Sequence, residues 1–349
     1  MEIRQIKLKI KFGLLGAALL AAIATAQAET ITLKVEHFLG PQTIQHNTML
    51  GDWCRNIERD SKGRLNCQIY HSMQLGGKPP QLFDQVKDGI ADVGWTVAGY
   101  SGTRFARLQV FELPFMMTNA EATSRAIWTY AEKYANEEFK DVKMLAVHVH
   151  GPGQIFTREA PITKLEDFKG KKLRGPTKQV TDLLKDLGAT PVAIPVPGVP
   201  EALSKGVIDG AVIPYEVAPG LKVNELTKFT SEPDPSFNAL YTTVFVMPMN
   251  KAKYESLPAD LKAVIDKNSG LEYSAFLGRT QAGADVPAKK VFQATAGHTI
   301  TTLPKSEMLK LQKATEKLDD AWVAEMNQRG FNGKEMLQAA RDLVKQFTK

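Results

Sequence analysis

The sequence contains few of the residues, and none of the motifs, on which enzyme centres are commonly built. Only two of its 349 residues are cysteines and six are histidines. It has no Gly-x-Ser-x-Gly turn, no His-Glu-x-x-His helix and no Cys-x-x-Cys pair, and the Gly-Pro-Gly of residues 151–153 lacks the pattern of a phosphate-binding loop. We therefore expect neither catalysis nor a bound cofactor or metal ion.

Long apolar runs are also missing, except near the N-terminus. Four basic residues, the apolar stretch 12–23 and Ala-Gln-Ala at residues 26–28 follow one another there. This order is typical of a cleaved export signal, so residues 1–28 are predicted to be removed and the mature chain to begin at Glu29. The apolar stretch is shorter than the roughly 20 residues of a membrane span, and an uncleaved anchor is the alternative.

A concentrated basic surface is absent as well. The chain has 44 basic and 38 acidic side chains, and the export signal contains four of the basic ones and one of the acidic ones. The charges of the mature part are therefore nearly balanced, and its lysines form no basic run interleaved with aromatic residues. We expect no binding to nucleic acid.

The two cysteines, Cys54 and Cys67, lie close together in the mature sequence. In an oxidising compartment this arrangement predicts one local disulfide between a helix and the strand that follows it. Two free buried thiols are the alternative. No histidine pair at ligand spacing lies nearby, which argues against a metal site.

The mature sequence alternates between strand and helix patterns. Residues 31–38 and 65–71 have the composition of strands, while residues 43–61 and 79–89 have the apolar periodicity or the end signals of helices. Such alternation predicts an α/β fold with largely parallel sheets, whose ligands bind at the carboxyl ends of the strands. The mature chain of roughly 320 residues is longer than chains that usually form a single hydrophobic core, so we expect two lobes.

Residues 171–214 form the most informative segment, a βαβ-type unit. A short basic strand ends at Arg174 and is followed at once by Gly175 and Pro176. This order places a permanently charged guanidinium at the mouth of a cleft, where its planar group can pair with both oxygens of a carboxylate. The segment predicts an acid-binding pocket; a structural ion pair is the alternative role of Arg174.

Five segments of the mature chain carry a resemblance to a known family. They are QLGG (74–77), VKDGIADVGWTVAGY (86–100), FELPFMM (111–117), FKGKKLRGP (168–176) and EALSKGVIDGA (201–211). In this order and spacing the chain resembles the DctP-type solute-binding proteins of TRAP (tripartite ATP-independent periplasmic) transporters. The resemblance covers essentially the whole mature chain and implies a periplasmic protein that delivers a small organic acid to a membrane permease.

The resemblance also implies two hinge-linked lobes that close on the ligand, with a long helix spanning both. The expected division is lobe I, 29–150; lobe II with Arg174, 151–238; a return to lobe I, 239–280; and the spanning helix with C-terminal helices packing on lobe II, 281–349. Pro287 is expected to kink the helical stretch in which it lies.

In relatives the arginine of the K-x-R-x-P strand clamps the ligand carboxylate, so the resemblance assigns this role to Arg174. Some relatives have another arginine twenty residues earlier, where this chain has Gln154. This departure argues against an acidic sugar and leaves room for a monocarboxylate or a hydroxy or keto acid. Gln154 is expected in the site, with a loop cap as the alternative.

The loop after the second strand of the Arg174 unit also differs from the corresponding loop of many relatives. Three prolines stiffen it, and Val196 and Pro197 are expected to form an apolar wall. Opposite this wall we expect Trp95, Thr96 and Tyr100; an ordinary core position is the alternative for Trp95 and Tyr100. Apolar walls with a few polar groups suit an aromatic or other partly apolar carboxylic acid.

For four further candidates a contact with the ligand and a position outside the site, at the surface in the case of Tyr215 and Glu216, are near-equal alternatives. They are His37 at the end of the first strand, Tyr215 and Glu216 after an Asp-Gly turn, and Phe237 beside a crossing between the lobes. His148 and His150 share one face of a strand and with His37 could be imagined as a metal site. No carboxylate has a matching spacing, so packing at the strand end is favoured.

The function predicted from these observations is capture of a small organic acid in the periplasm and its delivery to a TRAP permease. The alternative is a secreted hydrolase or lyase acting on organic acids. A binding protein would return its ligand unchanged, whereas an enzyme would convert it.

Overall fold

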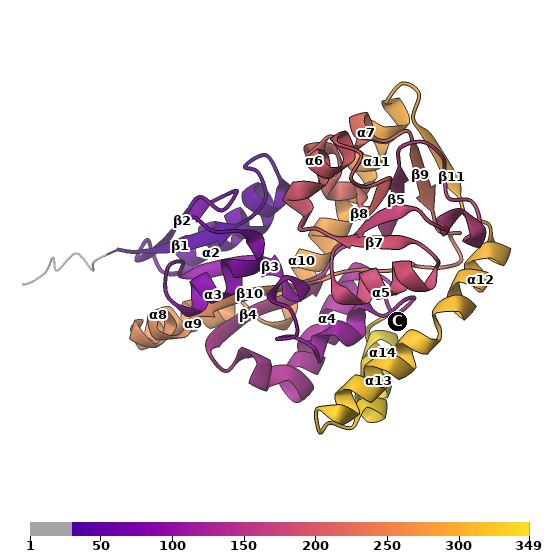
Figure 1. Ribbon diagram of the computed structural model, residues 1–349. Coiled ribbons are helices and arrows are strands. Elements are labelled where there is room, and N and C mark those ends of the chain that lie inside the picture. Colours follow the sequence, from indigo (N-terminus) through magenta and orange to yellow (C-terminus); the bar gives the residue numbers. More distant parts are fainter. Residues whose placement is uncertain (1–29, 349) are drawn as a thin grey trace, which may run out of the picture.

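The computed structural model describes residues 30–348 and shows two α/β lobes side by side (Figure 1). Each lobe is built on one sheet. The strand order is β2-β1-β3-β10-β4 in the first sheet and β11-β9-β5-β8-β6-β7 in the second. The predicted two-lobed α/β fold is therefore confirmed, while the predicted export signal lies outside the described residues.

The first sheet combines strands from two distant parts of the chain. Its strands are β1 (Ile31–His37), β2 (Leu65–Tyr70), β3 (Val93–Val97), β4 (Val142–Val149) and β10 (Val244–Asn250). β1 pairs in parallel with β2 and β3, whereas β10 lies antiparallel between β3 and β4. All seven residues of β10 are buried, because the strand is central and both of its faces are covered.

The second sheet is also mixed and positions Arg174. Its strands are β5 (Gly153–Thr157), β6 (Lys172–Gly175), β7 (Thr190–Ala193), β8 (Gly210–Pro214), β9 (Phe229–Glu232) and β11 (Thr299–Thr302). β6 lies between β7 and β8 and is parallel to both, whereas β5 is antiparallel to β8 and β9. Arg174 is thus near the carboxyl end of a central parallel strand, where ligands of α/β proteins bind.

Helices cover the faces and edges of both sheets (Figure 1). They are α2 (Gly51–Asp60), α3 (Leu82–Lys87), α4 (Ala120–Tyr130), α5 (Lys178–Asp186), α6 (Val199–Ser204), α7 (Val223–Leu226), α8 (Lys251–Ser256), α9 (Ala259–Lys267), α10 (Leu271–Gly283), α11 (Asp285–Ala294), α12 (Lys305–Thr315), α13 (Lys317–Gln328) and α14 (Gly333–Phe347). No helix among residues 30–348 is long and apolar enough to span a bilayer.

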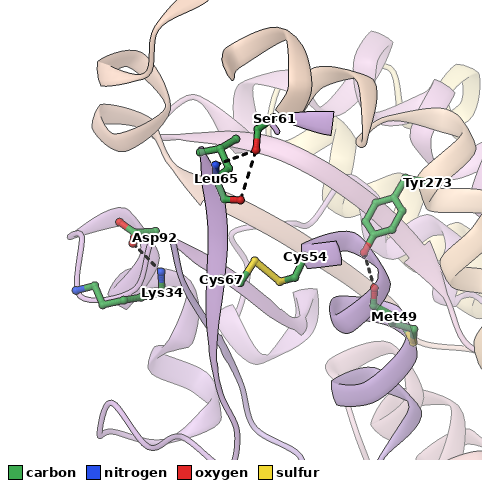
Figure 2. The surroundings of a disulfide bond; sticks show 8 residues. All are labelled: Lys34, Met49, Cys54, Ser61, Leu65, Cys67, Asp92 and Tyr273. Carbon is green, nitrogen blue, oxygen red and sulfur yellow. Dashed lines mark hydrogen bonds between the residues drawn. A yellow bond between two sulfur atoms is a disulfide. The ribbon is translucent and has the colours of Figure 1, made fainter. Parts of the chain in front are cut away.

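The helix predicted over residues 43–61 begins as the π-helical segment η2 (Gln45–Leu50) and continues as α2. Its Met49, Trp53 and Ile57 are fully buried, as the apolar spacing predicts. Cys54 of α2 forms a disulfide with Cys67 of β2, with the Cα atoms 5.6 Å apart (Figure 2). The predicted disulfide is confirmed, and the alternative of two free thiols is wrong.

α10 and α11 together connect the two lobes. α10 contacts β4 and α4 of the first lobe, while α11 contacts β11 and the short helix η10 (Tyr215–Val217) of the second. The helix is interrupted at Ala284, three residues before Pro287. The proline has no N–H to donate to the carbonyl of Gly283, so the expected kink lies just before it.

The C-terminal helices run along the flank of the molecule (yellow in Figure 1). α12 packs against α5, and α14 packs against α4. Trp322 of α13 is buried and donates a hydrogen bond of 3.0 Å from Nε1 to the carbonyl oxygen of Ala106. These helices therefore contact elements that come from widely separated parts of the chain.

Candidate functional site

A cavity lies between the lobes, at the carboxyl ends of β1, β3, β6 and β8. Its free volume is about 40 Å³, so the side chains of the two lobes leave little open space between them. Both sheets contribute to its wall, so the cavity exists only where the two lobes meet.

Arg174 provides the cation of this cavity and is only 2% exposed. Its Nε donates to the carbonyl oxygen of Ile194 at 2.7 Å, its Nη1 to that of Val212 at 3.1 Å, and its Nη2 to the hydroxyl oxygen of Tyr100 at 3.3 Å. A guanidinium has five N–H donors, so donors remain for a ligand. No ion pair among residues 30–348 involves this guanidinium, so the alternative of a structural ion pair has no support.

Tyr100 connects the two lobes across the cavity. Its hydroxyl oxygen accepts hydrogen bonds from Arg174 and, at 2.9 Å, from the backbone N–H of Val196. Burial raises the pKa of Tyr100, so the phenol stays protonated. Because the oxygen already accepts two hydrogen bonds, its own O–H remains as a donor.

Two more hydroxyl donors line the same cavity, Tyr241 and Thr243. Both hydroxyl oxygens are buried and have no hydrogen-bond partner among the described residues. Burial raises the pKa of Tyr241, and the nearby charge of Arg174 opposes this rise. Unpaired buried hydroxyls are costly, so their position beside the cation indicates a ligand that accepts hydrogen bonds.

Aromatic rings form the apolar wall on the first lobe. Trp95 stacks on Phe245 with ring centroids 4.6 Å apart and on Phe38 at 5.3 Å. Its indole Nε1 donates to Nε2 of His148 at 2.9 Å, which fixes the plane of the ring. Val196 and other aliphatic side chains of the second lobe line the cavity with these rings. Such walls suit a flat apolar group.

A carboxyl group, Glu216, lines another part of the cavity. It accepts hydrogen bonds from the side-chain amide of Gln281 at 2.6 Å and from that of Gln45 at 3.1 Å. Burial raises the pKa of Glu216 to about 7. Its backbone N–H donates to Asp285 at 2.8 Å, and burial together with Glu216 raises the pKa of Asp285 to about 8.

The lobes also contact each other beside the cavity. The hydroxyl of Thr177 donates to Glu112 at 2.6 Å, and Gln179 donates to Gln109 at 3.1 Å. Burial raises the pKa of Glu112 to about 7. Thr177 also packs so closely on Gly99 that a Cβ atom there would lie 2.5 Å from its methyl group. The two lobes are therefore in direct contact around the site.

Of the residues predicted to form the site, the structure brings five together around the cavity. They are Arg174, Trp95, Tyr100, Val196 and Glu216. The sequence reasoning missed Phe245, Tyr241, Thr243, His150 as a wall residue, and Gln281. The alternation of Tyr241, Thr243 and Phe245 along the chain entering β10 is the signal that could have identified three of them.

The other predicted site residues lie outside the cavity wall. Thr96 is on the opposite face of β3 from Trp95, because neighbouring residues of a strand point to opposite faces. The remaining ones have other contacts: Gln154 donates to the carbonyl of Pro152, Tyr215 donates to Glu232, Phe237 packs on Phe115, and Pro197 is exposed.

His37 supports the cavity from behind. It is fully buried, its Nδ1 accepts the backbone N–H of Leu39 at 3.3 Å, and its Nε2 lies 3.0 Å from Nδ1 of His46. Burial and the neighbouring histidines lower the pKa of His37 to about 3. Leu39 lines the cavity, so His37 acts on the site through this residue.

The imagined metal site of His37, His148 and His150 is not assembled. His148 pairs with Trp95, while His150 directs its Nδ1 to the carbonyl of Gly151, so that its Nε2 is an acceptor. Burial lowers the pKa of His150 to about 4, which keeps it neutral. Within residues 30–348 no group of three or more His, Cys, Asp or Glu side chains is arranged to hold a metal ion.

The sequence model of the bacterial extracellular solute-binding proteins, family 7 (DctP), matches residues 35–326. The chain belongs to this family. The predicted TRAP-type solute-binding protein is thereby confirmed, and the family is one of periplasmic receptors rather than enzymes.

Three solved structures are similar to this solute-binding protein over nearly its whole length. A TRAP solute-binding protein from Rhodoferax ferrireducens T118, in complex with copurified benzoate, is 49% identical with a TM-score of 0.90, and the match covers 91% of this chain and 99% of that one. A marine metagenome protein with 3-hydroxybenzoate is 44% identical, with a TM-score of 0.90 and coverage of 92% and 100%. One from Bordetella bronchiseptica with (R)- and (S)-mandelate is 27% identical, with a TM-score of 0.83 and coverage of 90% and 99%.

Proposed function

We propose that this solute-binding protein captures an aromatic monocarboxylate in the cavity between its lobes and delivers it to a TRAP permease. The observation that carries the proposal is the buried guanidinium of Arg174. It faces an aromatic wall and has no acidic partner among the described residues. A buried cation without a counter-charge is unfavourable, and a ligand carboxylate supplies that charge.

The polar groups around Arg174 match a carboxylate. The free guanidinium N–H groups and the hydroxyls of Tyr100, Tyr241 and Thr243 are all donors, and a carboxylate is acceptor-only with about four lone-pair sites. Hydrogen bonds to a charged group are about twice as strong as neutral ones. One carboxylate would satisfy several buried donors at once.

The remainder of the cavity favours an aromatic ring. Trp95, Phe245 and Phe38 form a stacked apolar wall, and the second lobe adds aliphatic side chains. The similar protein from Rhodoferax ferrireducens contains benzoate, and the marine metagenome protein contains 3-hydroxybenzoate. These ligands support an aromatic acid for this chain as well.

Capture is proposed to couple to closure of the lobes. Arg174 belongs to the second lobe and Tyr100 to the first, and the two residues touch across the cavity. A ligand that contacts both lobes binds the closed state more tightly than the open one, and it therefore shifts the population toward closure. The permease would then recognise the closed form.

The periplasmic location of the protein and the boundaries of its lobes are also part of the proposal. Residues 1–28 would direct export to the periplasm, and residues 29–150, 151–238 and 239–280 would form lobe I, lobe II and the return to lobe I. The spanning helix would begin within this return, with α10 (Leu271–Gly283), and residues 281–349 would contain its second part, α11, and the C-terminal helices, which contact both lobes.

Isothermal titration calorimetry tests the ligand class. We expect benzoate to bind stoichiometrically, to be recovered unchanged, and to bind at least about a hundredfold more tightly than benzamide, because the neutral amide does not neutralise Arg174. Succinate serves as the aliphatic control. If succinate binds and benzoate does not, the proposed ligand class is wrong.

A further inference from the structure

The cavity has two chemically different ends. Around Arg174 most free polar groups are donors, namely guanidinium N–H groups and the hydroxyls of Tyr100, Tyr241 and Thr243, whereas Nε2 of His150 is an acceptor there. Glu216 provides an acceptor elsewhere on the wall. No ion pair or hydrogen bond joins Arg174 to Glu216 in the part of the chain that the structure describes.

Side chains from three separate elements meet at the Glu216 end. Gln45 comes from η2, Glu216 from η10 and Gln281 from α10. Both glutamines direct their amide nitrogens to Glu216, at 2.6 Å for Gln281 and at 3.1 Å for Gln45. Their amide oxygens consequently point away from the carboxyl group.

The amide oxygens of the two glutamines have no hydrogen-bond donor among the described residues. Oε1 of Gln45 and Oε1 of Gln281 are buried and have no partner among the described residues, and the two side chains are 0% and 1% exposed. A buried acceptor without a donor is unfavourable. Gln281 and Glu216 line the cavity together, so the acceptors gather at one place in its wall.

We propose that Glu216 and Gln281, held in place by Gln45, bind a hydrogen-bond donor on the part of the ligand away from its carboxylate, so that the preferred ligand is a hydroxy-substituted aromatic acid. This inference rests on the proposed function, because it takes the carboxylate to lie at Arg174. An unsubstituted ring leaves the acceptors at the Glu216 end unpaired, whereas a phenolic O–H supplies the missing donor.

The burial of Glu216 supports a neutral donor rather than a cationic one. Burial raises the pKa of this carboxyl group to about 7, so the group is only partly charged at neutral pH. A full ammonium charge would have to be buried against a group that is itself partly protonated, which is costly. A hydroxyl group is neutral and can be buried there without a counter-charge.

Calorimetry with a matched set of ligands tests the inference. For the full mature protein we expect 3- or 4-hydroxybenzoate to bind about tenfold more tightly than benzoate, the effect of one good hydrogen bond. The corresponding methoxybenzoate, which has no donor, should lose this gain. Glu216→Gln should reduce the gain to about twofold or less, because one acceptor oxygen becomes a donor N–H₂.

A second variant provides the control. Thr243→Val removes a hydroxyl from the Arg174 end and keeps the side-chain volume nearly unchanged, so it should weaken benzoate and hydroxybenzoate by the same factor. If Glu216→Gln does not fold, as judged by its thermal melting, Gln281→Leu tests the same acceptor cluster. The expected result is again a loss of the hydroxyl gain.

Two results would overturn the inference. Equal affinities for benzoate and both hydroxybenzoates would show that no donor is recognised. A hydroxyl gain that survives in Glu216→Gln and in Gln281→Leu would show that these residues only hold the lobes together. In both cases benzoate still binds and the proposed function stands, whereas failure of every aromatic acid to bind would contradict the proposed function itself.

Discussion

The hydroxyl oxygen of Tyr100 lies 3.3 Å from Nη2 of Arg174 and accepts its N–H, so that one hydrogen bond joins the two lobes inside the cavity. The same oxygen accepts the N–H of Val196 on the second lobe. The proposed ligand anchor and the contact between the lobes are therefore one cluster. Changes in this cluster should alter ligand binding and lobe closure together.

Replacing the cation should abolish most of the binding. Arg174→Met removes the counter-charge of the ligand carboxylate, and loss of one partner of a buried charge pair costs about 3–5 kcal/mol. We expect benzoate to bind at least about a hundredfold more weakly in calorimetry, with Arg174→Lys intermediate because it keeps the charge but loses the planar fork. Arg279→Met on the exposed side of α10 is the control and should bind normally. Near-native affinity of Arg174→Met would contradict the assignment.

Removing the Tyr100 hydroxyl should weaken binding without unfolding the protein. Tyr100→Phe leaves the N–H of Val196 and one guanidinium N–H without an acceptor, and it removes a proposed donor to the carboxylate. We expect affinity for benzoate to fall about tenfold, which corresponds to about 1.4 kcal/mol. Tyr70→Phe, on β2, is the matched control. Small-angle scattering should show a smaller ligand-induced compaction for Tyr100→Phe, and unchanged affinity would argue against its role.

The disulfide should contribute to stability and not to the site. It joins α2 to β2 within a short loop, as Figure 2 shows, and closing a loop of this length stabilises a protein by about 3 kcal/mol. The double variant Cys54→Ser/Cys67→Ser should have a lower urea midpoint by a corresponding amount and unchanged benzoate affinity. Wild-type protein kept in reductant should behave in the same way. An unchanged midpoint would show that the bridge does not stabilise the fold.

The half-buried carboxyl group of Asp285 should make stability depend on pH. Its folded-state pKa is raised from 3.8 to about 8, so the folded protein holds a proton that the unfolded chain has lost between these values. Stability should therefore fall as the pH rises from about 4 to about 8. In urea unfolding, Asp285→Asn should gain about 1 kcal/mol or more over wild type between pH 5 and pH 8. A constant difference between the two proteins would contradict this origin.

The sequence alone was sufficient to predict the family, the disulfide and the cation Arg174, because each of these predictions depends on the local order of residues along the chain. Arg174 follows from a strand that ends in Arg-Gly-Pro, and the Cys54–Cys67 bridge from a helix followed by a strand. The expectation that Thr96 lines the cavity could have been avoided. Strand alternation assigns it to the face opposite Trp95, and the structure shows that arrangement.

Local alternation could at most place Tyr241, Thr243 and Phe245 on one face of the chain. Their meeting with Arg174 and Gln281 could not be predicted, because these residues come together only through the crossings between the lobes. Tyr241 and Thr243 line the cavity from the segment just before β10, and Gln281 lines it from α10. Gln45 and Glu216, which form a hydrogen bond, are 171 residues apart in the sequence. No periodicity within either segment reveals such a long-range pairing.

The central position of β10 also determines how this protein can be assembled. Residues 244–250 fill the gap between β3 and β4, so a fragment that ends before them would expose two unpaired strand edges in the middle of a sheet. The N-terminal part of the chain therefore cannot form the complete first sheet by itself. The first sheet can be completed only when residues 244–250, more than two thirds of the way along the chain, are available to pair with β3 and β4.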